Sequence, residues 1–418
     1  MPTRRELASE ATGPLKGVRV VDMTSVVFGA YATQMLGDLG ADVIKVEFPG
    51  GRRGAGGDTM RWTGRGQEGG PEDLGPIFIT INRNKRSLVL DLREQKAKTA
   101  LTRLIASADV FAASVRYDGL KRLGLDYEGV RAIKPDIVYV HAAGYGAAGP
   151  YAGEPAYDDL IQSASGLADL IGRVDGDPTP RLMPTLVADK VSGLFMANAV
   201  TAALFHRQRT GEGQFVEVPM MECLTTFTLT EHFFGHVYDP STGPWAYPRV
   251  TNPKRKPYQT LDGHIGLLPY TDNQWDQFFD AAGWGETFAK DPRFCDFRVR
   301  AQHGRELFAL VEEVVRTKTT DEWLALLKPL QIPVVKMNRL EDLPDDPHLD
   351  AVALFERYEH PEAGAYVAMR PPVNYSASPA NIRRHPPRLG EHTDEILAEL
   401  GLDVEADADA DAKTRADA

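Results

Sequence analysis

Asp189 is the acidic residue of greatest chemical interest in the sequence. It lies in the apolar segment TLVADKVSGLFMA, at the predicted start of a long helix. A carboxylate there can satisfy free backbone N–H groups at the positive end of the helix. Alternatively, a partly desolvated carboxylate can act as a covalent nucleophile. Gly193, four residues later, would let a substrate approach the helix closely. Spacing alone leaves both interpretations of Asp189 open.

A glycine-rich segment follows the predicted strand over residues 136–142. Gly144–Gly149 has the pattern G-x-G-x-x-G, which in dinucleotide-binding proteins lets the backbone approach a pyrophosphate. However, Pro150 and Pro155 fall where the crossover helix should run. The acidic pair at 158–159 comes about ten residues later, not the roughly twenty expected of a ribose ligand. We therefore favour a glycine loop that shapes a pocket, with a nucleotide site as the alternative.

Motifs for metal-dependent or serine-dependent chemistry do not stand out. The sequence has no Cys-x-x-Cys pair, no Gly-x-Ser-x-Gly segment and no P-loop. We therefore predict no metal site and seek a nucleophile among carboxylates and hydroxyls. Basic side chains flank two predicted strands, residues 87–92 and 108–114: Lys85, Arg86, Arg93, Arg116, Lys121 and Arg122. They are either phosphate ligands at the sheet edge or solvated loop charges.

The elements that must position these residues alternate along the chain. Short apolar runs separated by amphipathic helices are typical of βαβ units and a parallel sheet. We predict strands over 18–23, 41–47, 87–92, 108–114, 136–142 and 214–220, and helices over 28–40, 94–107 and from Asp189 to about 210. The sequence therefore predicts a three-layered α/β domain.

Length and composition set the domain organisation. The chain has 418 residues, of which 43 % are hydrophobic and 25 % charged, enough for a large core and a second domain. After about residue 227 the βαβ alternation stops, although Thr319 and Glu322 are spaced as a capping box. We expect unstructured residues 1–14, a large domain over 15–227, a smaller α+β domain over 228–332, a segment over 333–402 that returns to the large domain, and an unstructured tail over 403–418.

Charge and cysteine content exclude several classes of protein. Lys and Arg number 47 against 59 Asp and Glu, a net charge of −12, which argues against a nucleic-acid or membrane-surface binder. Two isolated cysteines, Cys223 and Cys295, are too few for a disulfide framework. No apolar run approaches the length of a membrane span, and the start of the chain is unlike a signal peptide. We predict a soluble cytoplasmic protein with no nucleic-acid or membrane partner.

Ordered blocks from about Leu15 to Leu402 resemble the family III CoA-transferases, the group of formyl-CoA and carnitine CoA-transferases to which α-methylacyl-CoA racemase is related. The blocks include VRVVDMTSVVFGAYATQMLGDLGADVIKVEFPG, Gly57-Asp58-x-x-Arg61, NRNKRSLVLDLR, VADKVSG, RTGEGQFVEVPMME and LGEHTDEIL. The resemblance implies a Rossmann-like large domain, an interlocked homodimer and no permanently bound cofactor. The family's catalytic aspartate falls on Asp189.

The resemblance also implies a reaction. CoA would move from an acyl-CoA to a small carboxylic acid through an aspartyl anhydride and an aspartyl-CoA thioester at Asp189. Matching positions imply that Val26, Val27 and Phe28 form a loop near the thioester, and that Tyr157 and Asp158 form a pair beside the active site. They also imply that Leu90 and Leu123 contact the adenosine. Arg93, Arg116 and Arg122 would contact the CoA phosphates.

Departures from the family pattern bear on substrate and reaction type. Val27 stands where formyl-CoA transferase has a glutamine and Phe48 where it has an arginine, which argues against formyl or oxalyl specificity. The related racemase uses a histidine in a His-Asp step as one of two bases, and the matching step here is Tyr157-Asp158. We therefore favour a transferase over a racemase. A non-catalytic CoA-binding dimer, or an oxidoreductase using the Gly144–Gly149 loop, is the alternative from another class.

Overall fold

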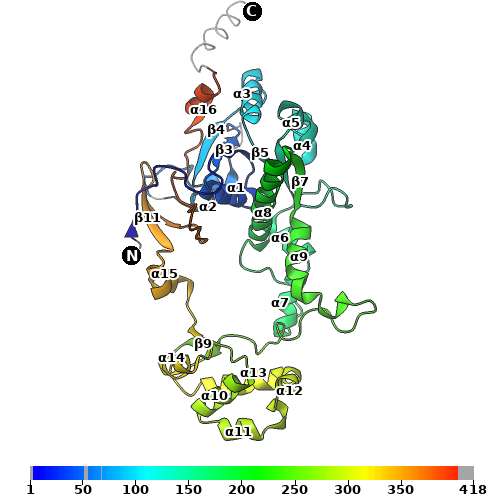
Figure 1. Cartoon of the computed structure of the whole chain (residues 1–418), viewed down its shortest axis with the longest axis vertical. Coiled ribbons are helices and arrows are strands. Elements are labelled where there is room, and N and C mark those ends of the chain that lie inside the picture. The colour runs from blue at the N-terminus through cyan, green and yellow to red at the C-terminus, as the bar shows by residue number, and fades with distance from the viewer. Residues whose placement is uncertain (1–2, 51–54, 67, 403–418) are drawn as a thin grey trace, which may run out of the picture. The chain divides into compact units, whose positions relative to one another are not determined.

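The computed structural model describes residues 3–50, 55–66 and 68–402 (Figure 1). The chain divides into two compact units. Unit 1 comprises the residues up to Ser165, Pro184–Phe227 and the residues from Pro347 onward. Unit 2 comprises Gly166–Met183 and Thr228–Asp346, so the division falls within α9 (Met220–His232). The tail over 403–418, which we expected to be unstructured, lies outside the described residues.

Unit 1 is built on a six-stranded sheet with all neighbouring strands parallel and the order β4-β3-β2-β5-β6-β7. The strands are β2 (Arg19–Met23), β3 (Asp42–Glu47), β4 (Lys85–Val89), β5 (Val110–Ala113), β6 (Val138–Ala143) and β7 (Gln214–Pro219). This order is that of a doubly wound sheet, whose direction of winding reverses between β2 and β5. The predicted α/β class is confirmed, and each strand lies within a few residues of its expected place.

One face of the sheet carries a wholly apolar core. Val21 and Met23 of β2 and Ile44 of β3 point to this face and pack with residues of the covering helices. Those helices are α3 (Gln95–Ala106), α4 (Tyr117–Leu123), α5 (Tyr127–Ile133) and α16 (Thr393–Glu399). Because strand residues alternate between faces, the intervening residues of β2, Val20 and Asp22, point to the opposite face.

The opposite face packs against α1 (Phe28–Asp38) and α8 (Val187–Thr210). Asp22, Lys45 and Lys85 project from three strands on this side and are fully buried. Lys85 donates to the carbonyl of Ala30 in α1 at 2.9 Å. Sheet and helix are therefore joined by buried polar contacts here, next to the point where the strand order reverses.

A small three-stranded sheet in unit 1 corrects the expectation for the N-terminus. β1 (Thr3–Arg4) pairs in parallel with β11 (Phe355–His360), which pairs with β12 (Gly364–Met369). Where we expected no structure, residues 3–5 are therefore paired with residues 356–357, and Ala8 donates to the carbonyl of Ile382. The remaining helices of unit 1 are α2 (Pro76–Ile81), α6 (Asp158–Ala164) and α15 (Pro347–Ala351).

Unit 2 has its own core of aromatic and aliphatic side chains. It contains an antiparallel sheet of β8 (Tyr258–Gln259), β9 (His264–Leu267) and β10 (Val334–Lys336), and helices α7 (Leu167–Asp175), α10 (Asp272–Ala282), α11 (Gly285–Lys290), α12 (Phe297–Gln302), α13 (Gly304–Val315) and α14 (Thr320–Leu327). The capping box of Thr319 and Glu322 is present at α14. The unit extends past residue 332, our expected boundary, because β10 pairs with β9. It also takes in Gly166–Met183, which we had placed in the large domain.

Candidate active site

Asp189 is the third residue of α8 and is only 6 % exposed. Its carboxylate accepts a hydrogen bond from the backbone N–H of Phe28, the first residue of α1. The N-termini of two helices therefore meet at this carboxylate. Gly193 makes the approach possible, since a Cβ there would lie 3.0 Å from the Phe28 carbonyl oxygen and 3.0 Å from Cδ1 of Tyr31. Our expectation that Gly193 admits a substrate was wrong: α1 occupies that space.

The N-terminus of α8 is capped from another helix. Oδ1 of Asp158, at the start of α6, accepts hydrogen bonds from the N–H groups of Ala188 at 2.7 Å and Asp189 at 3.1 Å. Its Oδ2 accepts from Nε2 of Gln162 at 2.6 Å. The capping role considered for Asp189 thus belongs to Asp158. The Asp189 carboxylate is left free of that task, which favours the chemical interpretation.

Burial and a like charge change the acidity of Asp189. Burial first, and then the negative charge of Asp158, raise its pKa to about 7, while the hydrogen bond from Phe28 acts in the opposite direction. A carboxylate with such a pKa exchanges its proton near neutral pH. Once ionised, it has lost part of its hydration shell and is a stronger nucleophile than a carboxylate in water.

The segment that leads into α1 contributes backbone groups, rather than side chains, to the surroundings of the Asp189 carboxylate. Val26 has a positive φ of 65°. Val27 is 4 % exposed and packs with Ala30 and Ile81 in a small apolar cluster. Of the three residues expected to form the loop near the thioester, Phe28 presents an N–H group to Asp189, and Val27 is a core residue.

The residues expected to contact CoA lie after two strands of the sheet. Arg116 precedes α4 and Arg122 lies within it, both exposed, while Arg93 follows β4 and is paired with Asp91 through its Nε at 2.8 Å. Leu123, at the end of α4, is 43 % exposed. Since β3 and β2 separate β4 from β5, the two groups of residues are about 14 Å apart at a strand spacing near 4.8 Å. Only an extended ligand could touch both.

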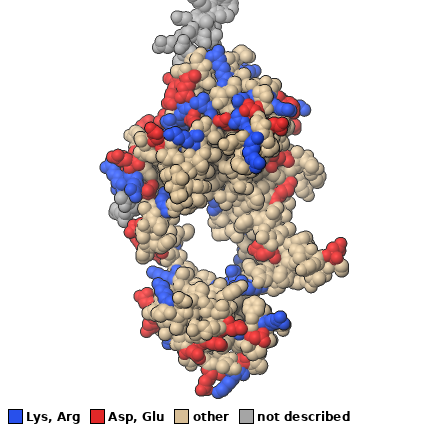
Figure 2. Space-filling model, viewed as in Figure 1, with Lys and Arg blue, Asp and Glu red and all other residues tan. Residues whose placement is uncertain are grey.

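Two of the other expected contacts differ in exposure. Tyr157 is 64 % exposed directly before α6, whereas Leu90 is 5 % exposed and belongs to the core beneath α3. Leu90 therefore offers little side-chain surface to a ligand. In Figure 2, positive and negative side chains are interspersed over α3, α4 and α5.

Lys85 and Arg86 are not sheet-edge ligands. Both are buried at the amino end of β4. We had expected them in a loop, before a strand that begins at residue 87. Lys85 pairs with Asp22 at 3.0 Å, and Arg86 pairs with Asp42 at 2.7 Å. Both side chains therefore serve packing within unit 1.

Two central N–H groups of the Gly144–Gly149 loop are bonded to carboxylates. The N–H of Gly146 donates to Glu222 at 3.0 Å, and that of Ala147 donates to Glu217 at 3.2 Å. A pyrophosphate placed there would face two carboxylates, which argues against the nucleotide alternative. The loop does line a cavity of about 350 Å³ beside Tyr151.

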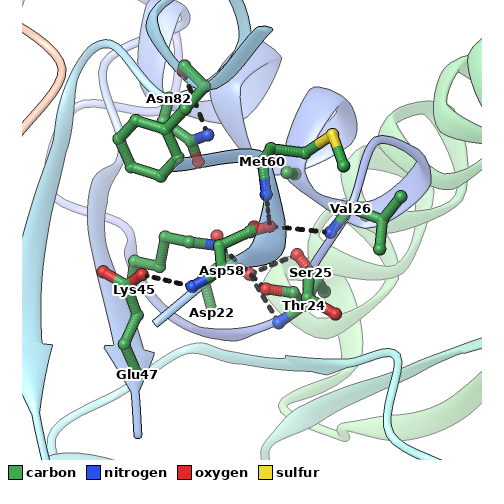
Figure 3. Close-up of polar contacts among 12 residues, drawn as sticks. Asp22, Thr24, Ser25, Val26, Lys45, Glu47, Asp58, Met60 and Asn82 are labelled. Atoms are coloured by element: carbon green, nitrogen blue, oxygen red, sulfur yellow. Dashed lines mark hydrogen bonds and ion pairs between the residues drawn. The ribbon is translucent and has the colours of Figure 1, made fainter. Parts of the chain in front are cut away.

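A buried charged cluster beside the α1 loop is the feature that the sequence interpretation missed. Asp58, Lys45 and Glu47 are at most 3 % exposed and are joined by direct contacts (Figure 3). Asp58 belongs to the Gly57-Asp58-x-x-Arg61 segment, to which we gave no role. A lysine in the middle of an apolar strand, Lys45 in β3, was the available signal, because buried lysines need an anionic partner.

A metal cluster or a membrane-spanning helix would change the class of site. Within residues 3–50, 55–66 and 68–402, no group of three or more His, Cys, Asp or Glu side chains is arranged to hold a metal ion. In the same ranges, no helix is both long and apolar enough to cross a membrane.

Known proteins that are similar to this chain identify its family. The sequence signature of CoA-transferase family III matches residues 15–393. An acyl-CoA transferase of Fusarium pseudograminearum is 32 % identical over 96 % of this chain and 87 % of its own length, and a succinate–glutarate CoA-transferase of Agrobacterium fabrum is 32 % identical over 93 % and 96 %. The crystal structure of a CaiB/BaiF family protein from Brucella suis aligns with a TM-score of 0.78 at 31 % identity, covering 93 % of this chain and all of that one. The chain belongs to CoA-transferase family III.

Proposed function

We propose that this enzyme transfers CoA from an acyl-CoA to a small carboxylic acid, with Asp189 as the covalent nucleophile. The observation that carries the proposal is the state of Asp189: it is buried, freed from helix capping by Asp158, and held by one backbone N–H at the start of α1. No other acid among the described residues combines burial with a pKa raised to about 7.

The first half-reaction moves the acyl group and then CoA onto the enzyme. The ionised Asp189 carboxylate attacks the thioester carbonyl carbon, the C–S bond breaks, and a mixed anhydride and CoA thiolate result. The thiolate then attacks Cγ of Asp189 in the anhydride. The donor acid leaves as its carboxylate, and Asp189 becomes a thioester of CoA. No net proton is taken up or released.

The second half-reaction repeats these bonds in reverse order. The acceptor carboxylate attacks the Asp189 thioester and expels CoA thiolate, giving a new anhydride. The thiolate attacks the acceptor's carbonyl carbon, so that the new acyl-CoA forms and the Asp189 carboxylate is regenerated. Each half-reaction begins and ends with one thioester and one carboxylate, so its reactants and products are close in energy.

Each attack at a carbonyl creates a tetrahedral oxyanion that needs a donor. The Phe28 N–H faces the Asp189 carboxyl group in the free enzyme. It is therefore suited to donate to the oxygen on Cγ when CoA or the acceptor attacks there. The Ala188 and Asp189 N–H groups are already engaged by Asp158.

CoA binding and assembly follow from the exposed side chains of unit 1. Arg116 and Arg122 would hold phosphates of CoA, with Arg93 available at the far end of an extended ligand. We also propose a homodimer, because α8 exposes Leu194, Phe195 and Phe205, each at 40 % or more, which is unusual for apolar residues of one helix. Light scattering on the purified protein reports the oligomeric state.

The named relatives support a small or medium carboxylic acid as acceptor. A succinate–glutarate CoA-transferase and an acyl-CoA transferase are among them. Val27 and Phe48 are both apolar, so neither position offers a polar side chain to a formate or oxalate. Val27 is also buried, whereas Phe48 is 43 % exposed.

Exchange of label tests the proposal. Incubation with succinyl-CoA and labelled succinate, without any second acid, should move label into succinyl-CoA, because the enzyme-CoA thioester forms before an acceptor binds. Asp189→Ala should abolish the exchange. Asp394→Ala, which removes an exposed first-turn acid of α16, should leave it intact. Exchange that survives Asp189→Ala would refute the role of Asp189. If succinate gives no exchange, glutarate and acetate with their CoA thioesters extend the donor series.

A further inference from the structure

The segment Thr24–Val27, which leads from β2 into α1, is held in an unusual backbone conformation. Val26 has φ of 65°, a region that β-branched residues rarely adopt. Such a conformation persists only where the surroundings over-determine it. Two residues later, the N–H of Phe28 reaches the Asp189 carboxylate. The shape of this segment therefore sets where that N–H lies.

Three buried charged side chains hold the segment (Figure 3). Oδ1 of Asp58 accepts from the Val26 N–H at 3.1 Å, and Nζ of Lys45 donates to the Thr24 carbonyl at 2.8 Å. Asp22 accepts from the N–H of Thr24 at 2.9 Å and from its hydroxyl at 2.6 Å. Each end of the short segment is thus bound to an ionised group.

Asp58 joins this clamp to the rest of unit 1. Its Oδ2 pairs with Nζ of Lys45 at 2.9 Å, and its Oδ1 also accepts from the N–H of Met60 at 3.0 Å. Its own N–H donates to Glu47 at 3.0 Å. Although burial alone lowers the pKa of Lys45, the adjacent Asp58 and Asp22 raise it. Lys45 therefore stays charged at neutral pH and keeps its pairing with Asp58.

We propose that Asp58 is a positioning residue for acyl transfer: through its bond to Val26 it fixes the Phe28 N–H against the Asp189 carboxyl group. The inference rests on the proposed function of Asp189 and adds to it a residue that touches neither substrate nor nucleophile. Lys45 assists by holding Asp58 and Thr24 together. Without the clamp, Val26 can return to negative φ, and the Phe28 N–H turns away from Asp189.

The test compares Asp58→Ala with Asp58→Asn, because the amide keeps an acceptor for Val26 but loses the pairing with Lys45. We expect kcat to fall about 10- to 100-fold in Asp58→Ala and roughly threefold to tenfold in Asp58→Asn, with KM for acyl-CoA within about twofold of wild type. The acid limb of the kcat profile should also move to higher pH, since Asp189 loses the hydrogen bond that favours its ionised form. Asp158 and Asp159, the acids that face Asp189 from α6, are unchanged in these variants.

Asp38→Asn is the matched control. Asp38 is equally buried and pairs with Arg83 at 2.6 Å, but at the opposite end of α1. It should lose stability without a change in kcat or in the acid limb. The proposal is overturned if the folded Asp58 variants match Asp38→Asn in both readouts; if Asp58→Ala does not fold, Asp58→Asn decides alone by the same criterion. Activity that survives Asp189→Ala would instead refute the proposed function, whatever Asp58 does.

Discussion

Asp189 and Asp158 are neighbouring carboxylates with different surroundings. Asp158 accepts two backbone N–H groups and a side-chain amide, so its charge is well satisfied. Asp189 has one backbone donor and the charge of Asp158 nearby. The first carboxylate is engaged in capping a helix and the second is not, which suits the covalent role proposed for Asp189.

Asp158→Asn tests the electrostatic part of this division. The amide oxygen can still accept from the start of α8, but the negative charge is gone. The pKa of Asp189 should fall, and the acid limb of the kcat/KM profile should move to lower pH by about half a unit or more. The value of kcat/KM at the pH optimum should change little. A profile that keeps its acid limb would show that Asp158 does not influence the titration of Asp189.

Asp189→Asn should separate stability from activity. A raised pKa means that the folded state binds the proton more tightly than the unfolded chain does, so stability falls as pH rises from about 4 to about 7. Replacing Asp189 by the neutral amide should therefore stabilise the protein by roughly 2–4 kcal/mol at pH 8 and hardly at all at pH 4. Thermal unfolding at both pH values measures this, and an equal change at both would contradict it.

At the scale of elements, the site depends on how closely α1 and α8 approach. The contact is set by Gly193, one turn beyond Asp189, which leaves no side chain between the helices. The N-terminus of α1 also follows β2, the strand beside which the sheet order reverses. Doubly wound sheets bind ligands at that place, and here the proposed nucleophile, Asp189, lies beside it at the start of α8.

Gly193→Val should push the two helices apart. Its side chain would meet Phe28 and Tyr31, and this overpacking should lower the free energy of unfolding by about 1–3 kcal/mol. We also expect kcat to fall, because Asp189 moves away from the Phe28 N–H. Ala202→Val, at an exposed position of the same helix, is the control and should retain activity. Equal kcat values for the two folded variants would argue that the helix contact does not set the reacting geometry.

At the scale of the molecule, the sheet could be predicted well and the polar contacts poorly. Alternating apolar runs located all six strands, since periodicity is a local property. The start of β4 was placed too late because Lys85 and Arg86 resemble loop residues, although both are paired with acids on distant segments. The pairing of β1 with residues near 356 and the capping of α8 by Asp158 are tertiary contacts with no local signal.

The role proposed for Asp189 came from family resemblance, not from its spacing. Its neighbours in sequence allow either a cap or a nucleophile, and the capping of α8 by Asp158 supports the second without testing it. The residues that we expected to contact CoA fall into two groups, one exposed and one buried. Arg116, Arg122 and Leu123 are exposed after β5, but Leu90 and Val27 are core residues whose apolar character had another cause.

Net charge makes local arginines important for binding a polyanion. The chain carries −12 overall, which repels CoA at long range. Arg116→Ala and Arg122→Ala should each raise KM for acyl-CoA by about threefold to thirtyfold with little change in kcat, as expected for binding shared by ground and transition states. Arg209→Ala, near the C-terminus of α8, should change neither constant. A fall in kcat at constant KM would place these arginines in the chemistry instead.

Trapping of the covalent intermediate tests the central claim most directly. The enzyme is incubated with succinyl-CoA without acceptor, quenched with hydroxylamine, digested and examined by mass spectrometry. We predict a hydroxamate confined to the peptide that contains Asp189, absent in Asp189→Asn and present in Asp394→Asn. A hydroxamate on a different residue, or label exchange between succinate and succinyl-CoA with no modified peptide, would contradict covalent catalysis by Asp189.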